Sequence, residues 1–241
     1  MTAGVRRIEW AASPHPLEAV LLENDCLSVT IIPTMGGHVA SLVDREAHRE
    51  LLWRNPRMTP RLAPYGAWFD DWWTGGWDEI FPAGDLSEFR GERLPYMGEV
   101  WCLPWACTHE VSDATASVTT VVETTIAPAR CERTLSLGGD EPILRAEYRI
   151  TNLDHQELAF TWGVHPAFAV ADGHVIDHGG RRMVVGEASG PSLGRPGQTY
   201  DWPWLPDAAA SDRRDMRRVP PATSLEFGGH WADLEDGWIS I

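Results

Sequence analysis

The chain has 241 residues, of which 43% are hydrophobic, and its formal net charge is -15. This length suffices for one sizeable core, so we expect a single domain over residues 1–241. The negative charge opposes binding to phosphate backbones and to anionic membrane surfaces, which excludes nucleic acids and membranes as expected partners.

Two further features indicate a cytoplasmic protein. The segment Met1–Trp10 holds two arginines, but no apolar run follows them that could serve as a signal sequence or span a bilayer. The four cysteines, Cys26, Cys102, Cys107 and Cys131, contain no CxxC pair. We therefore expect reduced and mostly buried thiols.

The first predicted elements are two strands. Apolar and polar residues alternate over residues 27–31, and Pro33 ends this run. Gly36 and Gly37 then turn the chain into a second strand over residues 38–43.

The middle of the chain repeats this pattern. It predicts strands over residues 118–126, 131–137 and 144–150, with a hairpin turn at residues 138–140. A further strand is predicted over residues 157–164. No stretch keeps a helical apolar period for three turns without meeting Gly or Pro. The expected fold class is therefore all-β, with antiparallel sheets and little helix.

The strand predicted over residues 157–164 has one face of small residues. Ala159, Thr161 and Gly163 share this face, and His165 continues it. Small neighbours leave a hollow above the face, so a ligand or another side chain must fill it.

A long loop region rich in Pro and Gly extends over residues 56–104. Long loops packed with aromatic residues usually form a binding surface. Six of the 13 tryptophans lie in or next to this region: Trp68, Trp72, Trp73, Trp77, Trp101 and Trp105.

An ordered series of short motifs resembles the aldose 1-epimerase, or galactose mutarotase-like, family. The series comprises Asn24 to Leu42, Glu50 to Pro56, Gly75-Gly-Trp-Asp-Glu-Ile-Phe-Pro82, Leu94-Pro-Tyr-Met-Gly-Glu-Val-Trp101 with Pro104-Trp105, Ile150-Thr-Asn152 and His165-Pro-Ala-Phe168. The resemblance implies a β-supersandwich whose concave face holds a pyranose. It also implies exchange of the sugar's anomers, without a metal or other cofactor.

Anomer exchange requires one group that protonates the ring oxygen and another that removes the proton from the C1 hydroxyl. His165 matches the family's acid position, and histidine suits this role because it titrates near neutral pH. The family's base is a glutamate on a late strand. Glu226 and Glu235 are the late glutamates here, and Glu226 is the candidate base.

Further residues are candidates for sugar binding. Asp78 and Glu79 could accept hydrogen bonds from sugar hydroxyls while Trp77 stacks on the ring. The alternative is that Trp77 belongs to the core and Asp78 caps a turn.

The remaining candidates for sugar contact come from two motifs, and they are Met97, Glu99 and Phe168. Met97 stands where the family often has a histidine, which removes one hydrogen bond to the substrate. Thr74 stands where family members that act on hexose phosphates have an arginine. This difference argues against a sugar phosphate as ligand.

Three alternatives remain open at the sequence level. The chain could be a non-catalytic carbohydrate-binding domain of the same fold. The alternating run Gly237–Ile241 either pairs as a final strand or indicates that C-terminal strands are missing. His174 and His178 have the spacing of a zinc pair on a helix, but their segment reads as strand or turn and no third ligand is in view. The sequence does not specify the sugar or the oligomeric state.

Overall fold

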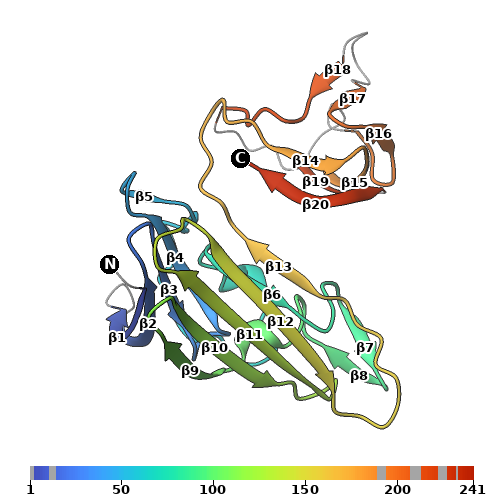
Figure 1. The fold of residues 1–241 in the computed structure, drawn as a ribbon. Coiled ribbons are helices and arrows are strands. Elements are labelled where there is room, and N and C mark those ends of the chain that lie inside the picture. The colour runs from blue at the N-terminus through green and yellow to red at the C-terminus, as the bar shows by residue number, and fades with distance from the viewer. Residues whose placement is uncertain (1–2, 11–14, 189–193, 207–212, 222–226, 232) are drawn as a thin grey trace. The chain divides into compact units, whose positions relative to one another are not determined.

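The structure is a computed structural model of the chain. It describes every residue except 1–2, 11–14, 189–193, 207–212, 222–226 and 232. The chain divides into two compact units, residues 1–169 and 170–241, which are described separately (Figure 1). The single domain expected over residues 1–241 stays a prediction.

The first unit is a sandwich of two antiparallel sheets. The larger sheet has the strand order β1-β2-β3-β4-β6-β13, with β5 paired to β4, and the smaller has the order β12-β11-β10-β9. The strands of the larger sheet are β1 (Gly4–Trp10), β2 (Leu17–Glu23), β3 (Leu27–Ile32), β4 (His38–Asp44), β5 (Arg49–Glu50), β6 (Trp77–Ile80) and β13 (Gly163–Pro166). Those of the smaller are β9 (Ala106–Val111), β10 (Thr115–Glu123), β11 (Ala129–Gly138) and β12 (Leu144–Asn152).

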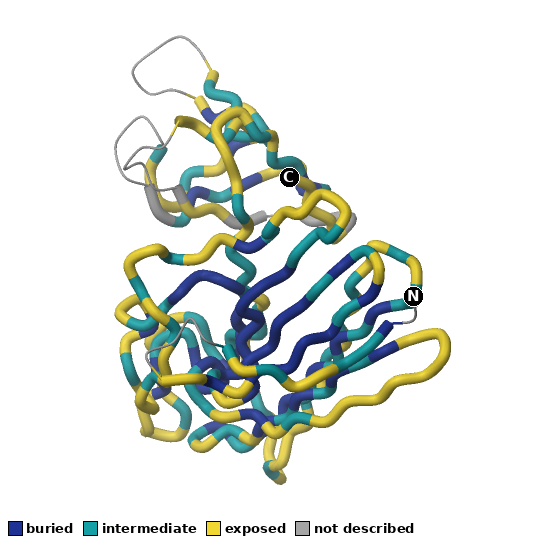
Figure 2. Tube along the Cα trace, turned by 90° about the vertical axis from the view of Figure 1, so that its left-hand side faces the viewer, coloured by how far each residue is buried: buried dark blue, intermediate teal, exposed yellow. Residues whose placement is uncertain are grey.

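Apolar side chains from both sheets form the main core between them. Val29 and Val39 come from the larger sheet, and Val118 and Leu135 come from the smaller one. Figure 2 shows several buried segments running side by side through the interior, with exposed segments around them. Burying these apolar faces is the main favourable contribution to folding.

Short elements complete the first unit. The hairpin β7 (Ser87–Phe89) and β8 (Glu92–Leu94) lies in the long loop region, as do the short 3-10 helices η1 (Phe69–Asp71) and η2 (Val100–Cys102). The described residues contain no α-helix. The prediction of an all-β fold with antiparallel sheets is therefore confirmed.

One predicted strand is wrong. The alternating run over residues 157–164 forms a strand only from Gly163 onward, where β13 meets β6, and before that a single backbone hydrogen bond joins the Thr161 N–H to the Pro82 carbonyl. Leu158 and Trp162 pack against a second core cluster, which explains their apolar alternation without a strand partner. The neighbouring strand β6 ends at Ile80, and the proline that follows shortly after has no N–H to extend the ladder.

Gly36 allows the predicted turn before β4. Its φ is +71°, and an added Cβ would lie 1.9 Å from the backbone carbonyl oxygen of Trp101, which is a severe clash. Left-handed backbone and this contact act together, so we expect Gly36→Ala to lower the free energy of unfolding by about 3 kcal/mol. Gly66 also has a positive φ, +77°, but no described atom lies within 4 Å of its Cβ position.

Gly66→Ala is therefore the matched control, and it should cost about 1 kcal/mol, the backbone part alone. Urea unfolding of both variants measures the two values. Equal losses would show that the approach to Trp101 does not contribute.

The second unit contains small antiparallel sheets around a core of Met183, Val185, Tyr200 and Leu205. Its strands are β14 (Asp177–Gly180), β15 (Arg182–Ala188), β16 (Thr199–Asp201), β17 (Trp204–Pro206), β18 (Arg213–Asp215), β19 (Phe227–Trp231) and β20 (Leu234–Ser240). The last of these pairs with β14, which confirms a paired strand at the alternating run near residue 240. Over the described ranges, no helix is long and apolar enough to cross a membrane.

Candidate functional site

Three polar side chains form a row on one face of the larger sheet. His165 of β13 pairs directly with Asp78 of β6. Val39 of β4 pairs with Trp77, which places His38 opposite Asp78 on the other side. Directly opposed residues in antiparallel strands have Cβ atoms about 4.5–5.5 Å apart on the same face. The sheet therefore brings two imidazoles to either side of one carboxylate.

A hydrogen bond joins two members of this row. His38 Nδ1 lies 2.7 Å from Asp78 Oδ1, and the two residues are only 2% and 5% exposed. Because a carboxylate accepts hydrogen bonds, Nδ1 is the donor and Nε2 is left as the other functional atom of the ring. Gly76 makes room for this ring, since a Cβ there would lie 2.6 Å from His38 Cε1.

His165, the predicted acid, lies half-buried against two aromatic rings. Its ring centroid is 5.6 Å from that of Phe69 and 5.3 Å from that of Trp73, in edge-on geometry. Its Nδ1 is buried without a hydrogen-bond partner among the described residues. The hollow expected above the small-residue face is thus filled by side chains from η1 and the residues after it.

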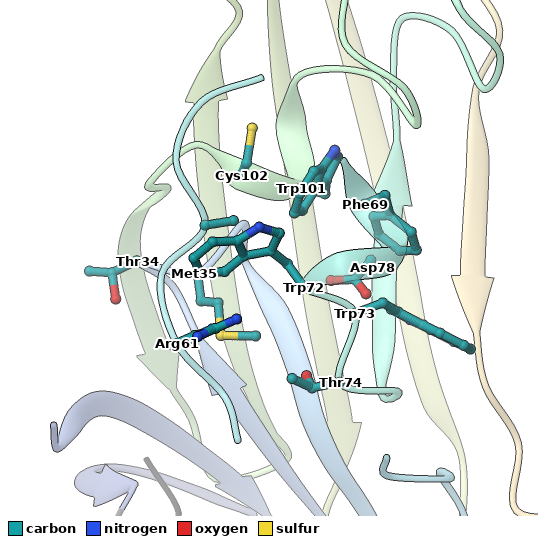
Figure 3. Close-up of a pocket in the computed structure, with 11 residues that line it drawn as sticks. Thr34, Met35, Arg61, Phe69, Trp72, Trp73, Thr74, Asp78, Trp101 and Cys102 are labelled. Atoms are coloured by element: carbon teal, nitrogen blue, oxygen red, sulfur yellow. The ribbon is translucent and has the colours of Figure 1, made fainter. Parts of the chain in front are cut away.

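A narrow cavity with four aromatic residues in its lining lies over Asp78 (Figure 3). Figure 3 shows the Asp78 carboxylate between the rings of Phe69 and Trp73. The volume available to a water-sized molecule is about 20 Å³, which is room for about one water. His165 contacts two rings of the cavity wall but is outside its lining.

Arg61 also lines this cavity, although it was not among the residues predicted for the site. Its guanidinium carbon lies 4.1 Å from the centroid of the Trp72 ring, as in a cation–π contact. An isolated arginine in a Pro-rich loop carries no motif signal, so only the folded loop reveals its position.

A second cavity lies beside His38. Its volume is about 220 Å³, and its lining includes Trp10, His38, Arg54, Asn55 and Thr74. Thr74 lines both cavities. The two cavities therefore adjoin on the same face of the sheet.

Glu79 lies in the interior and not at this face. Its side chain is fully buried, and Arg133 Nη1 donates to both carboxylate oxygens at 2.8 and 2.9 Å. Tyr148 Oη donates to the same carboxylate at 3.1 Å, and Arg133 also donates to the Gly37 carbonyl. The predicted sugar contact by Glu79 is corrected, because a sugar could reach this carboxylate only by breaking a buried ion pair.

The strand period explains this outcome. Successive side chains of β6 point to opposite faces, so Trp77 and Glu79 face the smaller sheet while Asp78 faces outward. Trp77 accordingly packs against the main core. The alternative assignment of Trp77 to the core is correct, and its predicted stacking on a sugar beside Asp78 is corrected.

Glu99 is also structural. It is fully buried and accepts backbone N–H bonds from Thr125, Ile126 and Ala127 at 2.7, 2.9 and 3.1 Å. Tyr65 Oη donates to it at 2.8 Å, and burial together with this carboxylate raises the pKa of the Tyr65 hydroxyl. The predicted sugar contact by Glu99 is corrected, because its oxygens hold the turn before β11.

The other predicted site residues are scattered. Met97 is half-buried with φ +63°, and it is not in the lining of either cavity. Phe168 is 38% exposed and forms an isolated bridge with Leu52. Glu226 lies outside the described residues, and the side chain of Glu235 is not described.

The described part of the chain contains no group of three or more His, Cys, Asp or Glu side chains that could hold a metal ion. His178 instead packs on Trp202, with ring centroids 4.0 Å apart. All four cysteines are free; Cys131 is buried and the other three are half-buried.

Comparisons with known proteins show the fold. No protein-family model matches the chain. A TPR-domain containing protein from Parabacteroides distasonis matches 83% of this chain with a TM-score of 0.57 and 16% identity. A galactose 1-epimerase from Lactobacillus acidophilus matches 76% of this chain with a TM-score of 0.52 and 12% identity. A putative aldose 1-epimerase from Escherichia coli matches 91% of this chain with a TM-score of 0.54 and 14% identity.

The matched regions are only 36%, 59% and 67% of those three proteins, respectively. The chain therefore corresponds to part of each. At these identities the likeness shows the architecture alone, an antiparallel β-sandwich like that of galactose mutarotase-like proteins.

Proposed function

We propose that this chain is an aldose 1-epimerase-like isomerase that acts on the anomeric centre of a free aldose. The observation that carries the proposal is the row of His38, Asp78 and His165 on one sheet face, bordered by aromatic rings. Two imidazoles and a carboxylate are the groups that proton transfer near neutral pH requires. The fold shared with a galactose 1-epimerase adds support by analogy.

In the proposed reaction His165 protonates the ring oxygen while a carboxylate takes the proton of the C1 hydroxyl. The ring opens, the C1–C2 bond rotates, and reclosure returns both protons. Asp78 lies next to His165 in the row, so we assign Asp78 as the base. The hydrogen bond from His38 holds the Asp78 carboxylate in its orientation. Glu226, the base expected from its late position, remains a second candidate. Apart from these proton transfers, only the bond between C1 and the ring oxygen breaks and re-forms, and no oxidation or reduction takes place, so the proposal includes no metal or other cofactor.

Access to His165 requires movement of Phe69 or Trp73, whose rings pack against it. Both belong to the loop region, where side chains move more readily than in a paired strand. A sugar that displaces these rings would keep an aromatic border on its apolar face.

Optical rotation of freshly dissolved α-glucose and α-galactose tests the proposal. We expect the wild-type chain to accelerate the approach to the anomeric equilibrium of at least one aldose above the buffer rate, in proportion to protein concentration. Common pentoses and hexoses complete the panel. No acceleration for any of them would contradict the isomerase function.

A non-catalytic carbohydrate-binding domain is the second candidate. The packed rings over His165 and the narrow cavity over Asp78 favour it, since neither leaves a sugar-sized space as the structure stands. Sugar-dependent quenching of tryptophan fluorescence without any change in mutarotation rate would identify this function.

A further inference from the structure

Two residues that line the cavity beside His38 carry buried polar atoms without partners among the described residues. Trp10 Nε1 and Thr74 Oγ1 are buried, and neither has a hydrogen-bond partner in the described part of the structure. Thr74 is only 4% exposed, and both residues line the cavity. Buried polar groups are normally paired, so these two atoms indicate a polar molecule that completes their hydrogen bonds.

Among the described residues that line this cavity, Arg54 and His38 are both already paired with carboxylates. Arg54 Nη2 lies 3.4 Å from Glu50 Oε2, and His38 Nδ1 is hydrogen-bonded to Asp78 Oδ1 at 2.7 Å. An anion such as a phosphate would therefore meet no unpaired cation at these positions and would face a chain of net charge -15. An uncharged ligand with several hydroxyl groups fits this environment better.

The size and position of the cavity point to a second sugar unit. Its volume of about 220 Å³ far exceeds the 10–15 Å³ or so that one water needs. It adjoins the cavity over Asp78 through Thr74, and the His38–Asp78 hydrogen bond connects their linings. A ligand with two sugar units could place one unit in each of these adjoining cavities.

We propose that the cavity beside His38 binds a neutral sugar unit, so that the ligand of this protein is a reducing disaccharide or the reducing end of a longer neutral saccharide. The sugar unit in this cavity donates a hydrogen bond to the Thr74 hydroxyl or accepts one from it. It also accepts a hydrogen bond from the Trp10 indole N–H. The reducing unit then lies over the row at Asp78. The assignment of the reducing unit rests on the proposed isomerase function, whereas the presence of the accessory site does not.

Isothermal titration of the wild-type chain with neutral disaccharides, namely maltose, cellobiose and lactose, tests this assignment. Glucose, galactose and glucose 6-phosphate are the comparison ligands. We expect at least one disaccharide to bind about tenfold more tightly than both monosaccharides, as one or two additional hydrogen bonds would give. Equal affinity for monosaccharides and disaccharides, no binding at all, or tightest binding of the phosphate would overturn the proposal.

Two variants locate the effect. Trp10→Phe removes the indole N–H and should weaken disaccharide binding by about 3- to 10-fold while changing monosaccharide affinity by less than about twofold. Thr74→Val removes the hydroxyl and should also weaken disaccharide binding. The exposed Trp204 gives the matched control Trp204→Phe, which should change neither affinity. Thermal unfolding shows that each variant is folded.

The outcomes separate the two proposals. Preferential disaccharide binding without mutarotation would contradict the isomerase function and leave the accessory site intact. Mutarotation of monosaccharides without any preference for disaccharides, or with no effect of Trp10→Phe and Thr74→Val, would contradict the accessory site alone.

Discussion

Replacing His165 with asparagine should slow catalysed mutarotation by about 100- to 10,000-fold, the usual contribution of a general acid. Asparagine retains hydrogen bonding at this position but cannot deliver a proton near neutral pH. We expect the loss mainly in kcat, because the imidazole acts on the ring oxygen as the ring opens. Polarimetry or exchange NMR on the aldose that the wild-type chain accelerates gives both constants.

His109 provides the control for this experiment. It is exposed on β9, on the other sheet from the row, so His109→Asn should retain wild-type kinetics. Asp78→Asn should also be strongly impaired if Asp78 is the base. An active His165→Asn variant would refute the acid assignment, and an active Asp78→Asn variant would leave Glu226 as the remaining base candidate.

Replacing Arg133 with methionine should lower the free energy of unfolding by about 3–5 kcal/mol, because the fully buried Glu79 carboxylate then loses its ion-pair partner. Burial raises the pKa of Glu79, and Arg133 opposes that rise. Without the guanidinium, the pKa of Glu79 in the folded state rises further.

This rise makes the loss depend on pH. Folding raises the pKa of this carboxyl group above its unfolded value near 4.5. Its contribution to stability is therefore fully present below the unfolded pKa, where the group is protonated in both states. That contribution is lost as the pH increases through the folded pKa. The destabilisation by Arg133→Met should therefore be smaller at about pH 5 than at about pH 8. Urea unfolding at the two pH values measures the difference.

Two controls test the cause. The double variant Arg133→Met, Glu79→Gln leaves no unpaired charge and should recover part of the stability and lose most of the pH dependence. Arg145→Met breaks an exposed pair with Glu141 and should have no measurable effect. An Arg133→Met loss that does not change with pH would show that lost packing, and not the buried carboxylate, causes it.

Sequence reasoning located only some of the thirteen strands described in the first unit, those whose side chains obey the strand period. The predicted runs at residues 27–31, 38–43, 131–137 and 144–150 fall within β3, β4, β11 and β12. The same reasoning failed at residues 157–164, since alternation reports which side chains are buried and not whether a neighbouring backbone pairs. Apolar contacts with a core cluster gave Leu158 and Trp162 the same pattern.

The candidate site shows the same limit more clearly. Asp78 and Glu79 are adjacent and chemically alike, yet one belongs to the outer row and the other to a buried ion pair. The ion-pair partner of Glu79 is Arg133, which lies 54 positions after Glu79 in the sequence. A residue so remote leaves no local signal in the motif around Asp78.

The sequence by itself determined the all-β class and the turns at glycine, because these depend on neighbouring positions and on backbone geometry. Tertiary structure alone decided that His38 joins Asp78 and His165, that Phe69 and Trp73 cover His165, and that two cavities adjoin at Thr74. These facts depend on strand register and on how a long loop folds over a sheet, which arise only when distant segments pack together.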